Sequence, residues 1–191
     1  MAAAKGKTLP DLLVPGLFIL FCGINPGLYS AAMGYHFARP GNRFWPTLYR
    51  AGITDRLLAP TDSADLLEFK CGLTDLVARS STSAAELTRE ELIAGQRILR
   101  NKVQRYTPRY LAVLGIGAYR LAFQRPLAAL GRQPEQMGST IVWVLPNPSG
   151  LNAHYSGAKL IAEFRKLRDQ AHGDESALRK KPSRNIDGRG R

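Results

Sequence analysis

Four short apolar runs, most of them bounded by turn-forming residues, constrain the fold of this chain more than any other feature. They cover Leu17–Cys22, Tyr110–Leu114 and Ile141–Leu145, with a shorter candidate at Leu73–Val77. Apolar runs of this length, flanked by glycine and proline, are typical of strands that are buried on both faces of a parallel sheet. The sequence therefore predicts four short parallel strands.

Helical patterns occupy the intervals between these runs. Thr88 and Glu91 have the spacing of a capping box just before Leu92, and apolar residues then recur at helical intervals. A second helix is expected after Gly117. A third is expected from about residue 156 to 171, with one apolar face and lysine and arginine on the other. Strands that alternate with helices predict an α/β fold.

The composition is that of one globular domain with an excess of basic residues. Of the 191 residues, 45% are apolar and 22% are charged, which is enough to bury a core. The 27 lysines and arginines exceed the 15 aspartates and glutamates, and the formal net charge is +12. Such a chain attracts polyanions, so nucleic acid is the first partner to consider, although solvated surfaces rich in lysine and arginine are common.

We expect the globular domain at residues 14–171, a flexible N-terminus at 1–13 and a basic, disordered tail at 172–191. Cys22 and Cys71 lack a CxxC spacing or a histidine partner, so we expect a reducing compartment and neither a metal site nor a disulfide. No apolar stretch resembles a signal peptide or a membrane span. The protein is therefore expected in the cytoplasm, at the nucleoid when bound to DNA.

The loop after the first apolar run places an asparagine at the edge of the predicted sheet. In open parallel sheets, ligands bind beyond the carboxyl ends of the strands. The sequence at this point is Gly23-Ile24-Asn25-Pro26-Gly27, in which Pro26-Gly27 fits the centre of a type II turn. The Asn25 side chain can serve a ligand, or it can stabilise its own backbone in an Asx-turn.

A second loop follows the last apolar run. It extends from Asn147 to Asn152 with the sequence NPSGLN, and it is anchored by proline with Leu151 at its tip. An exposed leucine of this kind can fold back onto the core. Beside a basic surface it can also act as a wedge that enters a stack of bases.

Together with Phe37 and Asn42-Arg43-Phe44-Trp45, these two loops resemble the mismatch-specific uracil-DNA glycosylases, relatives of the thymine-DNA glycosylases. The resemblance lies in VPGLFILFCGINPGL, FARPGNRFWPTLYRAGITDRLL, CGLTDLVAR and IVWVLPNPSGL, between Val14 and about Gln170. It implies a three-layer α/β sandwich, in which helices cover both faces of a twisted, four-stranded parallel sheet.

The resemblance also implies a function. The expected enzyme is a monofunctional glycosylase of base excision repair that uses no cofactor and acts as a monomer. It would flip uracil, especially uracil mispaired with guanine, out of double-stranded DNA and hydrolyse its N-glycosidic bond, leaving an abasic site. Single-stranded DNA is a further candidate substrate.

Carried over position by position, the resemblance assigns roles to residues of both loops. Asn25 corresponds to the residue that positions the attacking water, and Phe37 to the aromatic residue on which the flipped base stacks. The pyrimidine pocket is expected to be lined by Gly23, Ile24, Ser30 and Asn147. The loop that fills the hole left by the base corresponds to Gly150, Leu151 and Asn152.

The aromatic and charged residues near Phe37 can be explained without a role at the pocket. Phe44 and Trp45 are expected in the core at the base of a helix, whereas Phe37 is expected in a loop near the pocket because its segment is rich in proline and glycine. His36 and Arg39 can reach phosphate, or they can be solvated loop charges.

Asp75 departs from the family pattern, because relatives more often carry lysine or asparagine at this position, facing the pocket. Without the resemblance, the sequence favours a strand-edge aspartate in solvent or paired with an arginine such as Arg79. If Asp75 faces the pocket, its carboxylate can accept a proton from the attacking water and stabilise the cationic sugar, which the Asn25 amide does poorly. Asp75 is therefore a second catalytic candidate.

Another departure follows Leu151. Bacterial relatives usually show Ser-Arg there, whereas this chain reads Asn152-Ala153-His154. Without that arginine, we expect weaker discrimination between G:U and A:U pairs than the family name suggests.

Two other functions stay open at this point. Gly115-Ile116-Gly117 between a strand and a helix is a weak sign of a dinucleotide site, because the third glycine of that motif is missing. The other is a basic, non-catalytic DNA-binding module. Release of a base from a uracil-containing duplex without an added cofactor would exclude both.

Overall fold

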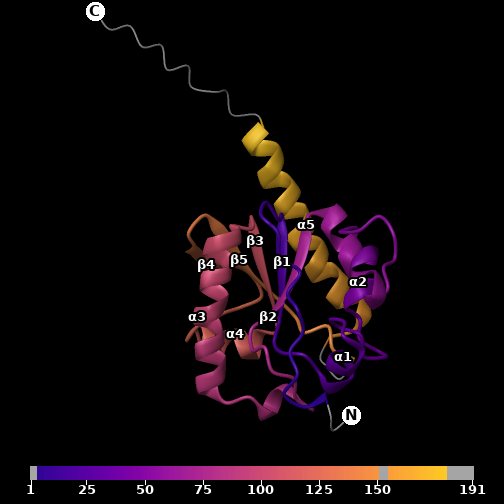
Figure 1. The fold of residues 1–191 in the computed structure, drawn as a ribbon. Helices are drawn as coiled ribbons and strands as arrows, with labels where there is room; N and C mark the ends of the chain where they lie inside the picture. Colours follow the sequence, from indigo (N-terminus) through magenta and orange to yellow (C-terminus); the bar gives the residue numbers. More distant parts are fainter. Residues whose placement is uncertain (1–3, 151–154, 180–191) are drawn as a thin grey trace, which may run out of the picture.

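The computed structural model describes residues 4–150 and 155–179, which form one sheet with helices on both faces (Figure 1). The strand order is β2-β1-β3-β5-β4. The pairs β1–β2, β1–β3 and β3–β5 are parallel, and β4 is antiparallel to β5. The strands are β1 (Ile19–Gly23), β2 (Cys71–Asp75), β3 (Tyr110–Leu114), β4 (Gly131–Met137) and β5 (Thr140–Leu145).

The four predicted parallel strands are confirmed, and the ends of β1, β2 and β5 are shifted. The largest shift is in β2, which was expected at Leu73–Val77 and ends at Asp75. Its partner sets this end, because Gly23 is the last residue of β1 and pairs with Asp75. The sheet also has a fifth strand, β4, that the sequence did not predict.

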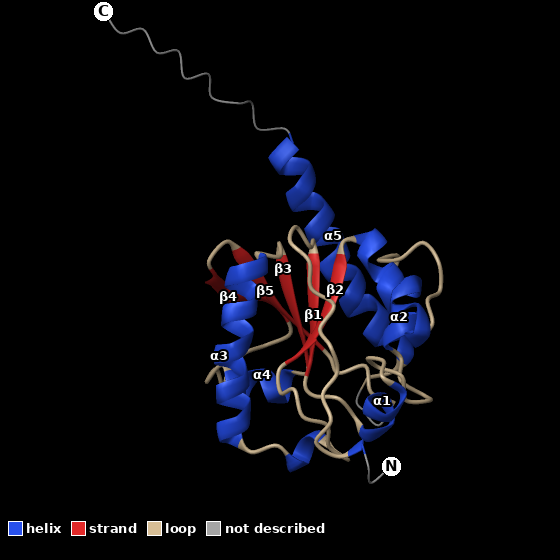
Figure 2. Ribbon diagram, in the orientation of Figure 1, coloured by secondary structure: helices blue, strands red, loops and turns tan. Residues whose placement is uncertain are grey.

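Helices cover the two faces of the sheet, which makes the predicted three-layer sandwich (Figure 2). On one face Phe44 and Phe164 pack with Phe21 of the sheet, and on the other face Leu99 packs with Leu20. The α-helices are α1 (Leu28–Met33), α2 (Phe44–Ala51), α3 (Arg89–Tyr106), α4 (Ile116–Ala122) and α5 (Gly157–Arg179). There are also the 3-10 helices η2 (Pro60–Phe69) and η3 (Ala84–Glu86).

The predicted capping box starts α3. Thr88 Oγ1 accepts a hydrogen bond from Glu91 N at 3.2 Å, and Glu91 Oε2 accepts one from Thr88 N at 2.8 Å. The Glu91 carboxylate also binds Arg79, and the side-chain hydrogen bonds from Arg79 lower the pKa of Glu91 to about 2. Arg79 is thus not the partner of Asp75 that the sequence suggested.

Both ends of the domain differ from the expectation. The ordered domain was expected to end at residue 171, but helix α5 continues to Arg179. Asp174 stabilises this extension, since it accepts hydrogen bonds from Tyr110 Oη and, at 2.8 Å, from Gln170 Nε2. The rest of the expected tail, residues 180–191, lies outside the described residues.

Residues 4–13, expected to be flexible, lie along the domain, and we call them the N-terminal strap. Leu12 forms an antiparallel bridge with Leu73 of β2, with N to O distances of 2.8 and 3.1 Å. Ala4 is buried at the other end of the strap. No helix in the described ranges is long and apolar enough to cross a membrane.

Candidate active site

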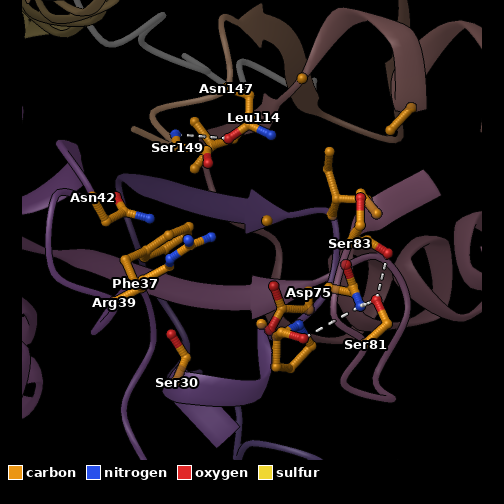
Figure 3. Close-up of a pocket in the computed structure, with 18 of the residues that line it drawn as sticks. Ser30, Phe37, Arg39, Asn42, Asp75, Ser81, Ser83, Leu114, Asn147 and Ser149 are labelled. Atoms are coloured by element: carbon orange, nitrogen blue, oxygen red, sulfur yellow. Dashed lines mark hydrogen bonds between the residues drawn. The ribbon is translucent and has the colours of Figure 1, made fainter. Parts of the chain in front are cut away.

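A pocket of about 540 Å³ lies at the carboxyl ends of the parallel strands (Figure 3). Four chain segments meet there because parallel strands end at the same edge of the sheet. They are the loops after β1, β2, β3 and β5, and the segment between α1 and α2 closes the pocket from the side. Every expected site residue from Gly23 to Asn147 lines this pocket: Gly23, Ile24, Asn25, Ser30, Phe37, Asp75 and Asn147.

The Asn25 amide is held by residues far away in the sequence. Its Nδ2 donates to Ser81 Oγ at 2.8 Å, to the carbonyl oxygen of Arg79 at 3.1 Å and to that of Pro26 at 3.3 Å. These contacts are not those of an Asx-turn, and they fix the orientation of the amide plane. Within the described residues, no hydrogen bond reaches Oδ1, which can therefore accept a hydrogen bond from a water molecule in the pocket.

Asp75 faces the pocket and pairs with His36. The distance from Asp75 Oδ2 to His36 Nδ1 is 3.2 Å, and both side chains are less than one-tenth exposed. The other ring nitrogen, His36 Nε2, lies 3.0 Å from the carbonyl oxygen of Pro10 in the N-terminal strap. Because both ring nitrogens face oxygen atoms that accept hydrogen bonds, His36 fits as an imidazolium paired with a carboxylate.

The surroundings of His36 support this protonated state. Burial lowers its pKa, but the hydrogen bond and negative charge of Asp75, with the Pro10 carbonyl and Asp11, raise the pKa above its usual value on balance. His36 had been considered as a phosphate contact or a solvated loop charge. That interpretation is wrong, because the side chain is buried and occupied by Asp75 and Pro10.

This pair makes the stability of the protein depend on pH. The folded state binds the His36 proton more tightly than the unfolded chain, so the stabilisation is fully present below pH ~6.5 and is lost as pH rises through the raised pKa. We expect the free energy of unfolding of the parent to fall relative to that of His36→Gln as the pH rises from ~6.5 through the raised pKa. Denaturant unfolding across this range tests it. The exposed His172 provides a control, His172→Gln, and parallel curves for the parent and His36→Gln would contradict the pairing.

Gly23 permits the approach of two pocket residues. A Cβ atom at this position would lie 2.3 Å from Asp75 Oδ1 and 3.3 Å from Phe37 Cζ. The first distance is shorter than any real contact, and both atoms belong to side chains that line the pocket. The absence of a side chain at the end of β1 is therefore what lets Asp75 and Phe37 meet there.

Phe37 forms part of the pocket wall through a left-handed backbone conformation. Its φ is +55°, which is uncommon for an aromatic residue and typical of functional loops. Phe44 supports the ring from behind, with centroids 4.1 Å apart and planes 26° from parallel. As expected, Phe44 and Trp45 are in the core, and Trp45 Nε1 donates to the carbonyl oxygen of His36 at 3.2 Å.

The second loop is fixed against the segment between α1 and α2. Asn147 Oδ1 accepts a hydrogen bond from Ser149 N at 2.9 Å, and Arg43 N donates to the carbonyl oxygen of Pro148 at 3.0 Å. At Gly150, a Cβ would lie 2.5 Å from the carbonyl oxygen of Gly41, so only glycine allows this approach. The expected wedge residues Leu151 and Asn152 lie outside the described residues.

The remaining expected pocket residues have supporting contacts. Ser30 is buried, and its Oγ accepts a hydrogen bond from Ala38 N at 3.0 Å. Ile24 lies beside Gly115, where a Cβ would be 3.0 Å from Ile24 Cδ1. Gly115 itself has a φ of +135° and starts α4, so the glycine-containing motif there forms a tight strand-to-helix turn.

Neither cysteine thiol suits nucleophilic chemistry. Burial raises the pKa of Cys71 to about 12, and burial together with Asp75 raises that of Cys22 well above its usual value. Across the described ranges, no group of three or more histidine, cysteine, aspartate or glutamate side chains could hold a metal ion.

Comparison with known proteins places this pocket in a family context. The solution NMR structure of a candidate uracil DNA glycosylase from Methanosarcina acetivorans has a similar fold, with a TM-score of 0.54 and 23% sequence identity over 85% of this chain and 98% of that chain. The sequence profile of the uracil DNA glycosylase superfamily matches residues 10–171, which include every pocket residue described above. The chain therefore belongs to the uracil DNA glycosylase superfamily.

Proposed function

We propose that this protein is a monofunctional DNA glycosylase that excises uracil, especially uracil mispaired with guanine, and leaves an abasic site. The observation that carries the proposal is the meeting of the Asn25 amide, the Asp75 carboxylate and the Phe37 ring in one pocket at the carboxyl edge of the sheet. A base within a duplex is out of reach of such a pocket, so the nucleotide must be extruded. Extrusion costs least at a mismatch.

The pocket offers a stacking surface and polar groups for a flipped pyrimidine. With Phe44 behind it, the Phe37 ring is a fixed surface, and stacking on it is favourable for any flat base. Negative charge develops on the departing base, where backbone N–H groups of the loop at Ile24 and the Asn147 amide can donate hydrogen bonds. These are the groups we propose for base recognition.

Asn25 and Asp75 can act on the attacking water in different ways. The water oxygen forms a bond to the sugar C1′, the bond from C1′ to the base breaks, and the electron pair leaves with the base. Asn25 Oδ1 can orient the water, but an amide is a poor base, so we assign the water proton to the Asp75 carboxylate. The same negative charge stabilises the cationic sugar.

The substrate range is tested by incubating the protein with duplexes that contain G:U, A:U or G:T pairs and with single-stranded uracil DNA. Alkali then cuts the strand wherever a base has been removed. We expect cleavage at uracil in the G:U duplex, and only a modest preference for G:U over A:U because Asn152-Ala153-His154 replaces Ser-Arg. A strong preference for G:U over A:U would contradict the expected modest preference. Binding without base loss would instead indicate a non-catalytic DNA-binding module.

Leu151→Ala tests the proposed wedge. Only a duplex leaves a stacked hole when the base is extruded, so we expect kcat/KM to fall roughly tenfold on G:U duplex and much less on single-stranded uracil DNA. Single-turnover excision on both substrates measures the two losses. Equal losses on duplex and single strand would rule out the wedge.

A further inference from the structure

We propose that the N-terminal strap is a contact surface for the DNA backbone, in which Lys5 and Lys7 neutralise phosphates beside the pocket. This proposal rests on the proposed function, in which duplex DNA is the substrate. It adds a binding element that precedes the first residue of the superfamily match, residue 10.

The strap backbone is fixed where the two lysines stand. Ser80 N donates to the carbonyl oxygen of Lys7 at 2.9 Å, and Gly6 N donates to that of Ser80 at 3.3 Å. Ser80 Oγ donates to the carbonyl oxygen of buried Ala4 at 2.5 Å. Lys5 and Lys7 thus lie on a backbone that is already ordered. A ligand that binds them therefore does not incur the entropic cost of ordering this backbone.

The strap is joined to the loop that holds Asn25. Ser80 lies between Arg79 and Ser81, and both of these neighbours accept hydrogen bonds from the Asn25 amide. Leu9 of the strap lines the pocket itself. The described start of the strap accordingly lies at the end of the sheet where the parallel strands have their carboxyl ends (Figure 1).

Positive charge stands on both sides of the pocket. In Figure 3, Arg39 lies on one side of the pocket and Ser81, next to the strap attachment, on the other. Lys5, Lys7 and Arg39 are exposed, and none forms an ion pair with a described residue. A DNA strand that crosses the pocket would meet Arg39 on one flank and the lysines on the other.

The surroundings of the lysines also suit phosphate. The acidic residue of the strap, Asp11, is neutralised by Lys102, whose Nζ lies 2.6 Å from its Oδ2. Exposed hydroxyl groups of Thr8, Thr82 and Ser83 lie on the strap and on the adjoining loop. Lysine, serine and threonine side chains are common phosphate contacts, and such contacts position a protein on DNA without reading its sequence.

The test compares the salt dependence of DNA binding by three full-length proteins: the parent, Lys5→Gln/Lys7→Gln and the control Lys70→Gln/Arg100→Gln. Lys70 and Arg100 are exposed and form no ion pair with a described residue, and Lys70 directly precedes β2, at the opposite end of the strand from Asp75. The probe is a duplex with a tetrahydrofuran abasic analogue opposite guanine, and the dissociation constant is measured from 50 to 300 mM KCl.

Each neutralised phosphate contributes about 0.9 to the slope of log K against log salt, so the strap variant should have a slope shallower by about 1.8. Its dissociation constant at 0.1 M salt should rise by up to roughly 60-fold. The control should keep both the parent slope and the parent single-turnover excision rate. A strap variant with the parent slope would overturn the strap proposal alone, because the parent would still bind and excise. A parent that binds no DNA would overturn both proposals.

Discussion

Replacing Gly23 by alanine is expected to reduce excision roughly 100-fold or more while the sheet stays folded. The new methyl group would lie 2.3 Å from Asp75 Oδ1 and 3.3 Å from Phe37 Cζ. Asp75 must therefore leave its position beside His36, and Phe37 must shift by a few tenths of an ångström. Both displacements disturb the two groups on which the proposed chemistry depends. Single-turnover excision on G:U duplex measures the effect.

Gly117→Ala is the matched control for this prediction. Gly117 also lines the pocket, but a Cβ there meets nothing within 4 Å. Its position within α4 favours alanine over glycine, so this variant should excise uracil at the parent rate and be at least as stable. Thermal unfolding and duplex affinity show whether the Gly23 variant has kept its fold. A folded Gly23→Ala protein with parental activity would mean that the space at the end of β1 is not used for the base.

Asn25→Ala should lower the single-turnover rate roughly 100-fold, with folding and DNA binding largely intact, because the amide holds a loop and a water and does not fill the core. The residual activity should depend on Asp75. Asp75→Ala should therefore also be slow, and the double variant slower than either single one. Because the two groups act on the same water, we do not expect their effects to add.

Asp75→Asn removes the carboxylate but keeps a hydrogen-bond acceptor for His36. Its amide oxygen can still accept the hydrogen bond from His36 Nδ1, but an amide cannot accept the proton of the water. Activity lost in this variant, with the fold retained, would support a catalytic role for the carboxylate. If Asp75→Ala excised uracil as fast as the parent, both in duplexes and in single strands, Asp75 would have no catalytic role.

The parallel strands could be predicted because their side chains are buried on both faces. The run Tyr110–Leu114 coincides with β3 at both ends. By contrast, β4 is an edge strand in which Gln133 and Met137 are buried and the residues around them are mostly exposed. Burial alternates along β4, but its inward positions include Gly131, Gln133 and Glu135, which are not apolar, and Pro134 lies where the pairing is irregular. No local pattern marks such a strand.

The site was predictable where a residue stands in a motif next to a strand end, as Asn25 and Asn147 do. The contacts that orient these groups could not be predicted in this way, since they come from other parts of the chain. Ser81 is 56 positions from Asn25, and His36 meets Asp75 only because the segment after α1 folds over the end of β2. Pro10 of the strap, expected to be flexible, supplies the second acceptor for His36.

The most direct test of the account is the chemistry of the products. The parent protein is incubated with a G:U duplex without any added cofactor, free uracil is quantified by mass spectrometry, and the strand is analysed before and after alkali treatment. The account predicts one free uracil for every alkali-sensitive site, with the strand intact until alkali is added. A duplex that is bound and recovered with its uracil in place would contradict the proposed glycosylase activity.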